Sequence, residues 1–489
     1  MSLSDRVSRG LRAELAGQAV SMGAKAGLMV LLARYLLTPA EWGLLQFALP
    51  IVGVLAVFGT LGLPKSAARY VTEYAERDPG QIPHVVGQTL RYLVALVAVV
   101  GGALAVGADA LANWLNTPAV APFLLVGVGY VAFRSFSNLT GLLFQGFNRV
   151  DYKAVVTVTT AVVQLLAAVG LVLAGYGALG AFVGYVAGFA VAAVVGLVIL
   201  RRRVLANIEA ADEVDADLTR RLLEYSVPLT ATRGANVLDK KVDAILVGVL
   251  LNVTAVGYYA LAKQVADFVS MPATAFGFTI SPAIGEQSAG RRDDRAASIY
   301  QESLRHLLLL YVPACSGIVL VAEPMVRYVF GSAYLPAVPV VQVFAGYVLL
   351  DAVNQMTSDT LDYLGRARSR AVVKSVMAVS NFVLTLALVP VLGVLGAAVA
   401  TIVTYATYTV ANVRVIHDEL GLDGVRLCTD LAVACLVSVG MAVVVLVSLP
   451  LVSGVLTLFA VVGVGFGAWA VLGTASGLLD VRRVVGVLR

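Results

Sequence analysis

Charged and polar side chains inside apolar segments are the residues of this sequence best suited to chemistry. Segment 225–251 is long enough to cross a bilayer, yet it contains Arg233, Asp239, Lys240, Lys241 and Asp243. A charge at the centre of a spanning helix costs roughly 2.5–3.5 kcal/mol, so this group cannot face lipid. Arg233, Lys240 and Asp243 recur with Asn236 at helical spacing and share one face. We expect that face to line water, a partner helix or an anionic ligand.

Other apolar segments also carry polar residues on one helical face. Segment 17–37 contains Lys25, and segment 256–281 contains the i, i+4 pair Lys263 and Asp267. Two further faces combine Arg134 with Asn138 and Gln145, and Asp351 with Asn354 and Gln355. Since each face needs surroundings other than lipid, we expect them to converge on a hydrophilic, net-positive cavity.

The residue types in this predicted cavity favour an anionic ligand that carries sugars. Lysine and arginine suit phosphate, arginine also through its bidentate fork, and amides can donate to and accept from sugar hydroxyls. The candidate substrate-binding residues are Lys25, Arg134, Asn138, Gln145, Arg233, Asn236, Lys240, Lys241, Asn354 and Gln355. Asp243, Asp267 and Asp351 are candidates for balancing the cations or for binding a coupling Na⁺ or H⁺.

Structural roles are the alternatives for several of these charges. Lys263 and Asp267 have the spacing of an intrahelical ion pair, and Asp243 could simply neutralise Lys240. Arg233 could extend its side chain to the cytoplasmic interface. Lys25 and Arg134 have no carboxylate four residues away, which favours a ligand role for them.

Composition identifies the class of protein that must position these residues. The chain has 489 residues, of which 59% are hydrophobic and 13% charged, against about 25% charged in soluble domains. Continuous apolar runs exclude a β-barrel pattern and predict an all-α polytopic membrane protein. With about 20 residues per crossing, the sequence predicts about fourteen transmembrane helices near 17–37, 42–63, 88–112, 119–145, 154–175, 178–200, 227–250, 256–281, 304–324, 338–362, 371–390, 393–414, 428–449 and 452–474.

The distribution of positive charge predicts the orientation. Placing the N-terminus in the cytoplasm puts most of the 35 basic residues in cytoplasmic segments. We therefore expect a multi-pass protein of the cell membrane with both termini cytoplasmic. The net charge of +5 then indicates contact with membrane lipids and not with nucleic acid.

An internal repeat predicts two lobes. Segment 36–48 (LLTPAEWGLLQFA) matches 250–262 (LLNVTAVGYYALA), so that Gly43 aligns with Gly257. Six predicted helices separate the copies, as in transporters built from parallel repeats around a central cavity. We expect an N-terminal lobe at 1–200, a cytoplasmic linker at 201–226, a C-terminal lobe at 227–415, two extra helices within 427–474 and a cytoplasmic tail at 475–489.

Catalytic signals do not accompany this pattern. The sequence has no Gly-rich phosphate loop, no HExxH and no nucleophile elbow. Its cysteines, Cys315, Cys428 and Cys435, show neither a disulfide framework nor metal spacing. We expect a protein that is not an enzyme, has no cofactor beyond the coupling Na⁺ or H⁺, and is monomeric.

Several segments together carry a family resemblance. They are 31–51 (LLARYLLTPAEWGLLQFALPI), 68–78 (ARYVTEYAERD), 144–154 (FQGFNRVDYKA), 256–286, 329–345 and 364–401. The chain resembles the polysaccharide-transporter, O-antigen flippase-like branch of the multidrug/oligosaccharidyl-lipid/polysaccharide exporter superfamily. The extra helices at 427–474 depart from the shorter, twelve-helix members.

The resemblance implies a function that agrees with the cationic cavity. It implies alternating-access translocation of a polyprenyl- or dolichyl-(di)phosphate-linked oligosaccharide from the cytoplasmic to the outer leaflet, for cell-surface polysaccharide or glycoprotein glycan assembly. Glycan-assembly enzymes would then be partners. Two alternatives stay open: a multidrug cation exporter of the same superfamily, and a lipid II flippase for peptidoglycan synthesis.

Overall fold

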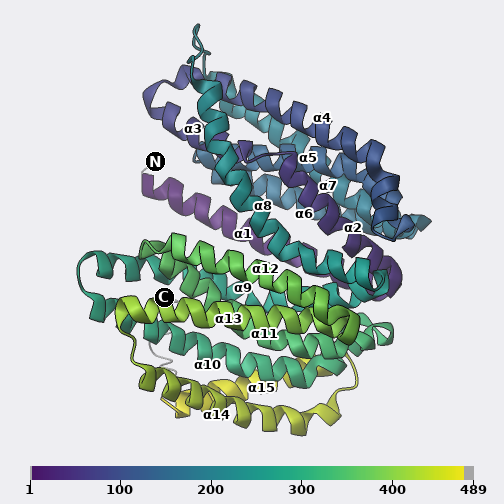
Figure 1. Cartoon of the computed structure of the whole chain (residues 1–489), viewed down its shortest axis with the longest axis vertical. Helices are drawn as coiled ribbons and strands as arrows, with labels where there is room; N and C mark the ends of the chain where they lie inside the picture. The colour runs from purple at the N-terminus through teal and green to yellow at the C-terminus, as the bar shows by residue number, and fades with distance from the viewer. Residues whose placement is uncertain (1–2, 478–489) are drawn as a thin grey trace. The chain divides into compact units, whose positions relative to one another are not determined.

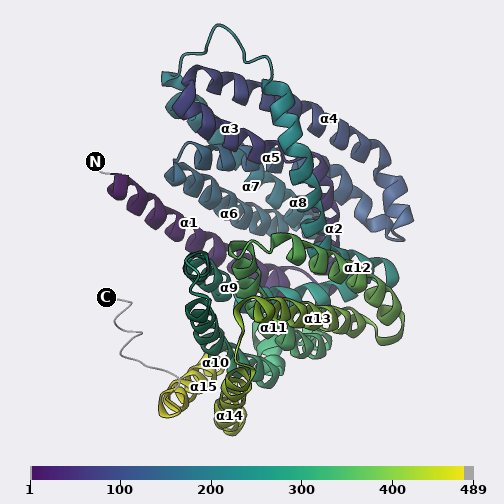
Figure 2. The same cartoon turned by 60° about the vertical axis from the view of Figure 1, so that its left-hand side comes forward.

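The computed structural model describes residues 3–477, without the side chains of 3–13, 231–233, 235, 236, 238, 239 and 275. Within this part of the chain every regular element is helical and no strand occurs, so the all-α prediction is confirmed. The contacts divide the chain into two compact units, Met1–Gly257 and Tyr258–Arg489, which are described separately (Figures 1 and 2).

The first unit contains eight described α-helices. They are α1 (Leu3–Leu31), α2 (Pro39–Phe58), α3 (Leu63–Arg77), α4 (Ile82–Trp114), α5 (Ala121–Gly146), α6 (Val150–Leu171), α7 (Gly177–Ile199) and α8 (Leu218–Leu250). Helix α6 packs against both α1 and α7, and α5 contacts α2, α3, α4 and α7. Helices α1, α2, α5 and α6 thereby surround one polar interior region of this unit.

The second unit is formed by the helices that follow. They are α9 (Val253–Ala289, whose first turn belongs to the first unit), α10 (Asp293–Met325), α11 (Val338–Tyr363), α12 (Ala367–Leu392), α13 (Val394–Leu420), α14 (Gly424–Ser448) and α15 (Val455–Ala475). Helix α14 packs against α10 and α15, and the Trp469 indole donates a hydrogen bond to the Leu309 carbonyl at 2.7 Å. This contact fixes α15 to α10.

Twelve segments of the described chain are long and apolar enough to cross a membrane. One of them, Val150–Asn207, contains both α6 and α7. Helix α8 is not among the twelve, although it was predicted as a span, because its charges lower its hydropathy. Helix α3, which begins at the end of the second predicted span (42–63), is amphipathic. The multi-pass membrane prediction is confirmed, and the count of fourteen helices is approximate.

Helix ends follow local sequence signals. Thr38 and Glu41 form a capping box, in which the Glu41 amide donates to the Thr38 hydroxyl at 3.3 Å and the Glu41 carboxylate accepts from the Thr38 amide at 2.9 Å. Pro39 then occupies the first turn, where its missing N–H costs nothing. Gly43, one turn later, lies so close to the start of α9 that a Cβ would be 1.8 Å from the Val253 carbonyl oxygen.

The predicted cytoplasmic linker is shorter and more ordered than a solvated connector. Helix α8 begins at Leu218, so the second half of the predicted linker 201–226 is largely helical. The remaining loop is docked on the segment before α4: Ala211 donates to the Gly80 carbonyl at 2.9 Å, and the Gln81 amide donates to the Glu213 carbonyl at 2.8 Å. Helix α8, placed by prediction at the start of the second lobe, packs against α2 and α3 of the first unit. The lobe boundaries themselves stay a prediction.

Candidate functional site

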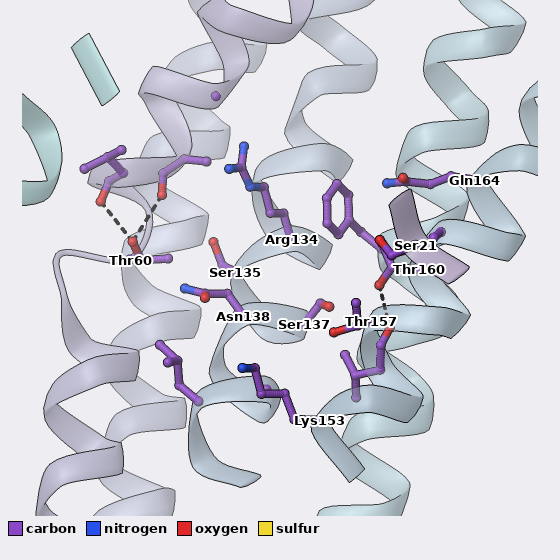
Figure 3. A pocket seen from close by; sticks show the side chains of 18 of the residues that line it. Ser21, Thr60, Arg134, Ser135, Ser137, Asn138, Lys153, Thr157, Thr160 and Gln164 are labelled. Atoms are coloured by element: carbon purple, nitrogen blue, oxygen red, sulfur yellow. Dashed lines mark hydrogen bonds between the residues drawn. The ribbon is translucent and has the colours of Figure 1, made fainter. Parts of the chain in front are cut away.

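A polar cavity of about 570 Å³ lies inside the first unit. The described lining residues come mainly from α1, α2, α5 and α6 (Figure 3). Thr60 follows α2, Phe189 is on α7 and Val237 is on α8. The lining includes three cations, Lys25, Arg134 and Lys153, and the neutral polar residues Ser21, Thr60, Ser135, Ser137, Asn138, Thr157, Thr160 and Gln164. No aspartate or glutamate is among the described residues that line it. The cavity therefore offers positive charge and hydrogen-bonding groups to a ligand.

Arg134 extends from α5 into this cavity (Figure 3). Its guanidinium donates a hydrogen bond to the Tyr130 hydroxyl at 2.9 Å, and its Cζ lies 5.4 Å from the centre of the Tyr130 ring and 6.0 Å from that of Phe189. These aromatic contacts orient the guanidinium without neutralising it. No carboxylate of the described residues forms an ion pair with Arg134, so its charge is available to an anion.

Lys25 comes from α1 and lies one helical turn beyond Ser21, which also lines the cavity. Helix α1 reaches this position because Gly17 permits a close approach to α6: a Cβ on Gly17 would be 3.2 Å from the Cβ of Ala154. Lys25 is exposed and forms no ion pair with a described carboxylate. It is thus a second cation without a counter-ion in the described structure.

Lys153 is the third lining cation and differs from the other two. Its Nζ lies 2.9 Å from Oε1 of Glu14 on α1. Thr157, Thr160 and Gln164 follow Lys153 at helical spacing on α6 and also line the cavity. Helix α6 therefore presents a continuous polar face.

The neutral lining groups are arranged to accept and to donate hydrogen bonds. Ser135 and Thr160 donate their hydroxyl hydrogens to carbonyls of their own helices, and Thr60, in the turn after α2, donates to the Val57 carbonyl of α2 at 3.1 Å. These bonds leave oxygen lone pairs for a ligand. Asn138 also lines the cavity (Figure 3), and its amide can both donate and accept hydrogen bonds. Such a set suits hydroxyl-rich ligands.

Three of the predicted site residues line this cavity, and the other described ones do not. Lys25, Arg134 and Asn138 are lining residues, whereas Gln145 is exposed near the end of α5. Lys240 and Lys241 are exposed on α8, whose described side chains reach the cavity through Val237. The side chains of Arg233 and Asn236 lie outside the described residues. A binding role for each of these residues stays a prediction.

The carboxylates and amides of the remaining predictions have other surroundings. Asp267 forms the expected intrahelical ion pair with Lys263, whose ammonium also donates to the Tyr347 hydroxyl at 3.0 Å. Asn354 is buried and donates to the Thr409 hydroxyl at 2.7 Å. The last three are Asp243, which is buried in α8, and Gln355 and Asp351, which are partly buried in α11. Their roles in ligand binding or ion coupling stay predictions.

Lys153 is the main lining residue that sequence reasoning missed. The predicted span 154–175 begins one residue after Lys153, so the predicted topology places Lys153, like Arg149, in a cytoplasmic segment. The signal was nevertheless present: Lys153, Thr157, Thr160 and Gln164 have the spacing of one helical face. Among the described residues no group of three or more His, Cys, Asp or Glu could hold a metal ion.

Comparison with known sequences identifies the family. The sequence model of the family described as "Polysaccharide biosynthesis protein" matches residues 8–288, more than half of the chain. That of the MatE family matches residues 228–391. A relative in Haloferax volcanii, named as a probable low-salt glycan biosynthesis flippase, is 26% identical over 31% of this chain and 32% of its own length. An uncharacterized membrane protein of Methanocaldococcus jannaschii is 24% identical over 53% of this chain and 63% of its own length. The chain thus spans less than two thirds of either relative.

Comparison with solved structures identifies the fold. The inward closed conformation of the lipid II flippase MurJ superposes with a TM-score of 0.75 at 14% identity, covering 95% of this chain and 98% of that one. An inward-facing multidrug resistance transporter of the MATE family superposes with a TM-score of 0.65, also at 14% identity, covering 83% and 98%. At these identities the similarity establishes a shared fold, and the fold expected from the family resemblance is confirmed.

Proposed function

Because this chain belongs to the polysaccharide biosynthesis protein family, we propose that it is a flippase for a polyprenyl- or dolichyl-(di)phosphate-linked oligosaccharide. The proposed direction is from the cytoplasmic to the outer leaflet, by alternating access, in cell-surface polysaccharide or glycoprotein glycan assembly. The name of the Haloferax volcanii relative, a probable glycan biosynthesis flippase, supports this substrate class.

The observation that carries the proposal is the charge of the cavity in the first unit. Three cations line it, and no described carboxylate does. Moving a phosphate headgroup with attached sugars through hydrocarbon unaided would cost on the order of tens of kcal/mol. A cavity that supplies cations for phosphate and amide or hydroxyl groups for sugars lowers that cost. The isoprenoid tail needs no such site, since it can stay in the lipid.

The same observation argues against the main alternative, export of cationic drugs. A cationic ligand requires carboxylates in the binding cavity, because like charges at close range repel. The match of residues 228–391 to the MatE family fits common ancestry with drug exporters. A lipid II flippase remains the second alternative, since that substrate also combines a diphosphate with sugars.

Transport in proteoliposomes tests the proposal. A fluorescent polyprenyl-diphosphate oligosaccharide is placed in both leaflets, and the fraction protected from a membrane-impermeant glycosidase is followed over time. We expect the protected fraction to fall with active protein and to stay constant in protein-free vesicles. Uptake of a cationic dye is measured in parallel. Dye uptake without movement of the sugar lipid would overturn the proposed substrate class.

A further inference from the structure

One of the three cavity cations already has an anionic partner. Lys153 lies 2.9 Å from the Glu14 carboxylate, whereas Lys25 and Arg134 form no ion pair with a described residue. Glu14 itself is not among the described residues that line the cavity. Glu14 on the neighbouring helix α1 therefore partly neutralises the charge that Lys153 offers to a ligand.

The Glu14 carboxylate is only half satisfied by its surroundings. Its Oε1 accepts hydrogen bonds from both the Lys153 ammonium, at 2.9 Å, and the Gln18 amide, at 3.0 Å. Its Oε2 is buried and has no hydrogen-bond partner among the described residues, although the side chain as a whole keeps 17% of its surface exposed. A buried acceptor without a partner destabilises the arrangement. This contact is thus weaker than a fully hydrogen-bonded ion pair and can be exchanged for a better one.

The pair joins two walls of the cavity. Glu14 is on α1 and Lys153 is on α6, directly beside the close contact between Gly17 and Ala154. Helix α1 also carries Lys25, further along the same cavity. Any change in the Glu14–Lys153 contact therefore acts on the helix that positions a second ligand-facing cation.

We propose that Glu14 is a resident counter-ion for Lys153 that an anionic headgroup displaces when it binds. This inference rests on the proposed function and adds a positioning residue to it. A phosphate oxygen replaces Oε1 of Glu14 as the partner of Lys153, and Glu14 turns away to water. When the headgroup leaves, Glu14 recaptures Lys153 and so competes with rebinding. Glu14 therefore weakens binding of the headgroup and speeds its release.

The variant Glu14→Gln tests both the effect of Glu14 on headgroup binding and its effect on headgroup release. It removes the competing charge while keeping a side chain of the same length. For a polyprenyl-diphosphate disaccharide we expect binding to become tighter by up to about fivefold, because losing one partly exposed competing ion pair changes the free energy by about 0.2–1 kcal/mol. We expect the maximal flipping rate to fall, because release of the headgroup is slowed. A neutral glycolipid with the same disaccharide should bind equally to both proteins.

Two controls distinguish exchange from a merely structural ion pair. Asp151→Asn is the matched control, because Asp151 pairs with Arg149 at 2.9 Å close by but does not line the cavity; it should change neither binding nor rate. The double variant Glu14→Lys, Lys153→Glu restores an ion pair between α1 and α6 but places a carboxylate in the cavity. Exchange predicts that this variant folds and loses diphosphate binding; normal diphosphate binding by the folded variant would overturn the exchange.

The outcomes also separate this inference from the proposed function. Normal binding of the diphosphate lipid by the wild type, with unchanged affinity and rate in Glu14→Gln, would overturn the exchange and leave the flippase proposal intact. Lack of binding and flipping of this lipid by the wild type would overturn the proposed function. Tighter binding with a slower maximal rate in Glu14→Gln, together with lost binding in the double variant, would support both.

Discussion

Replacing Arg134 by alanine is the most direct test of the cationic cavity. The structural loss is small, because the side chain makes one hydrogen bond, to Tyr130, and cation–π contacts with Tyr130 and Phe189. These contribute about 1 kcal/mol and about 0.5–1 kcal/mol to stability. No described carboxylate is left without its partner. We therefore expect Arg134→Ala to fold and insert normally.

The functional loss should be larger than the structural one. A hydrogen bond between arginine and a phosphate contributes about 1.5–3 kcal/mol, which corresponds to about 10- to 150-fold in affinity. Arg134→Lys keeps the charge but not the bidentate fork, so we expect an intermediate loss. Tyr130→Phe removes only the hydroxyl that orients the guanidinium and should cost less than either change.

The assay combines binding of a polyprenyl-diphosphate disaccharide with the glycosidase-protection assay in proteoliposomes. Thermal unfolding in detergent and size-exclusion profiles verify that each variant is folded. Loss of binding in the order Tyr130→Phe, Arg134→Lys, Arg134→Ala would support the assignment. Wild-type binding and flipping by a folded Arg134→Ala would refute the reasoning, since no other described lining residue offers a planar bidentate donor of this kind.

Two further predictions concern stability. Gly43→Ala should lower the thermal unfolding midpoint, because its Cβ would lie 1.8 Å from the Val253 carbonyl oxygen and such overpacking costs about 1–3 kcal/mol or more. The matched control is Gly27→Ala, whose new Cβ has no atom within 4 Å. Equal unfolding midpoints for the two variants would contradict the close approach at Gly43. Asp215→Asn should loosen the docked loop 208–217, measured as faster amide hydrogen exchange. The Tyr74 hydroxyl donates to the Asp215 carboxylate at 2.5 Å and lowers the pKa of that carboxyl, while burial and this bond raise the pKa of Tyr74 to about 12. The stability that ionised Asp215 contributes is therefore fully present above the ordinary aspartate pKa of about 3.9. It is lost as pH falls through the lower pKa of Asp215 in the folded state. Acidification should therefore remove the difference in amide hydrogen exchange between wild type and Asp215→Asn.

Hydropathy predicted the bounds of a helix well where the whole helix is predominantly apolar and less well where the helix has a polar extension. The predicted span 338–362 agrees with α11 (Val338–Tyr363) within one residue. By contrast, the predicted span 17–37 begins well inside α1 (Leu3–Leu31), and the span predicted from residue 304 begins inside α10, which starts at Asp293. A window of apolar residues detects the part of a helix in hydrocarbon, because only that part needs to be apolar. Its polar extension leaves no hydropathy signal.

The candidate site was predictable to the extent that a charge lay deep in an apolar run. Lys25 and Arg134 met this condition, and both line the cavity. Gln145 shares the face of Arg134 by spacing, yet it is exposed near the end of α5. Helical spacing fixes the direction of a side chain around its axis, but the depth at which a cavity ends depends on which helices pack alongside. That packing is a tertiary property, which a single-helix pattern does not contain.

The surroundings of Lys153 also depend on tertiary packing, so its role could not be predicted from its position in the sequence. At the first turn of α6, it has the sequence context of a cytoplasmic loop cation, which topology rules count as an orientation signal. The fold places it instead on the polar face that also carries Thr157 and Thr160, opposite Glu14 of α1. A cation at the start of a helix can therefore both favour one membrane orientation and line a binding cavity, because this cavity extends to the end of the helix. The charge balance of the cavity depends on this residue. Among the described residues, two lining cations have no ion-pair partner while Glu14 pairs with Lys153, and the proposed displacement of Glu14 would leave three. A diphosphate headgroup, with more negative charge than a monophosphate, gains more from a third cation, so the proposed exchange predicts a preference for diphosphate carriers.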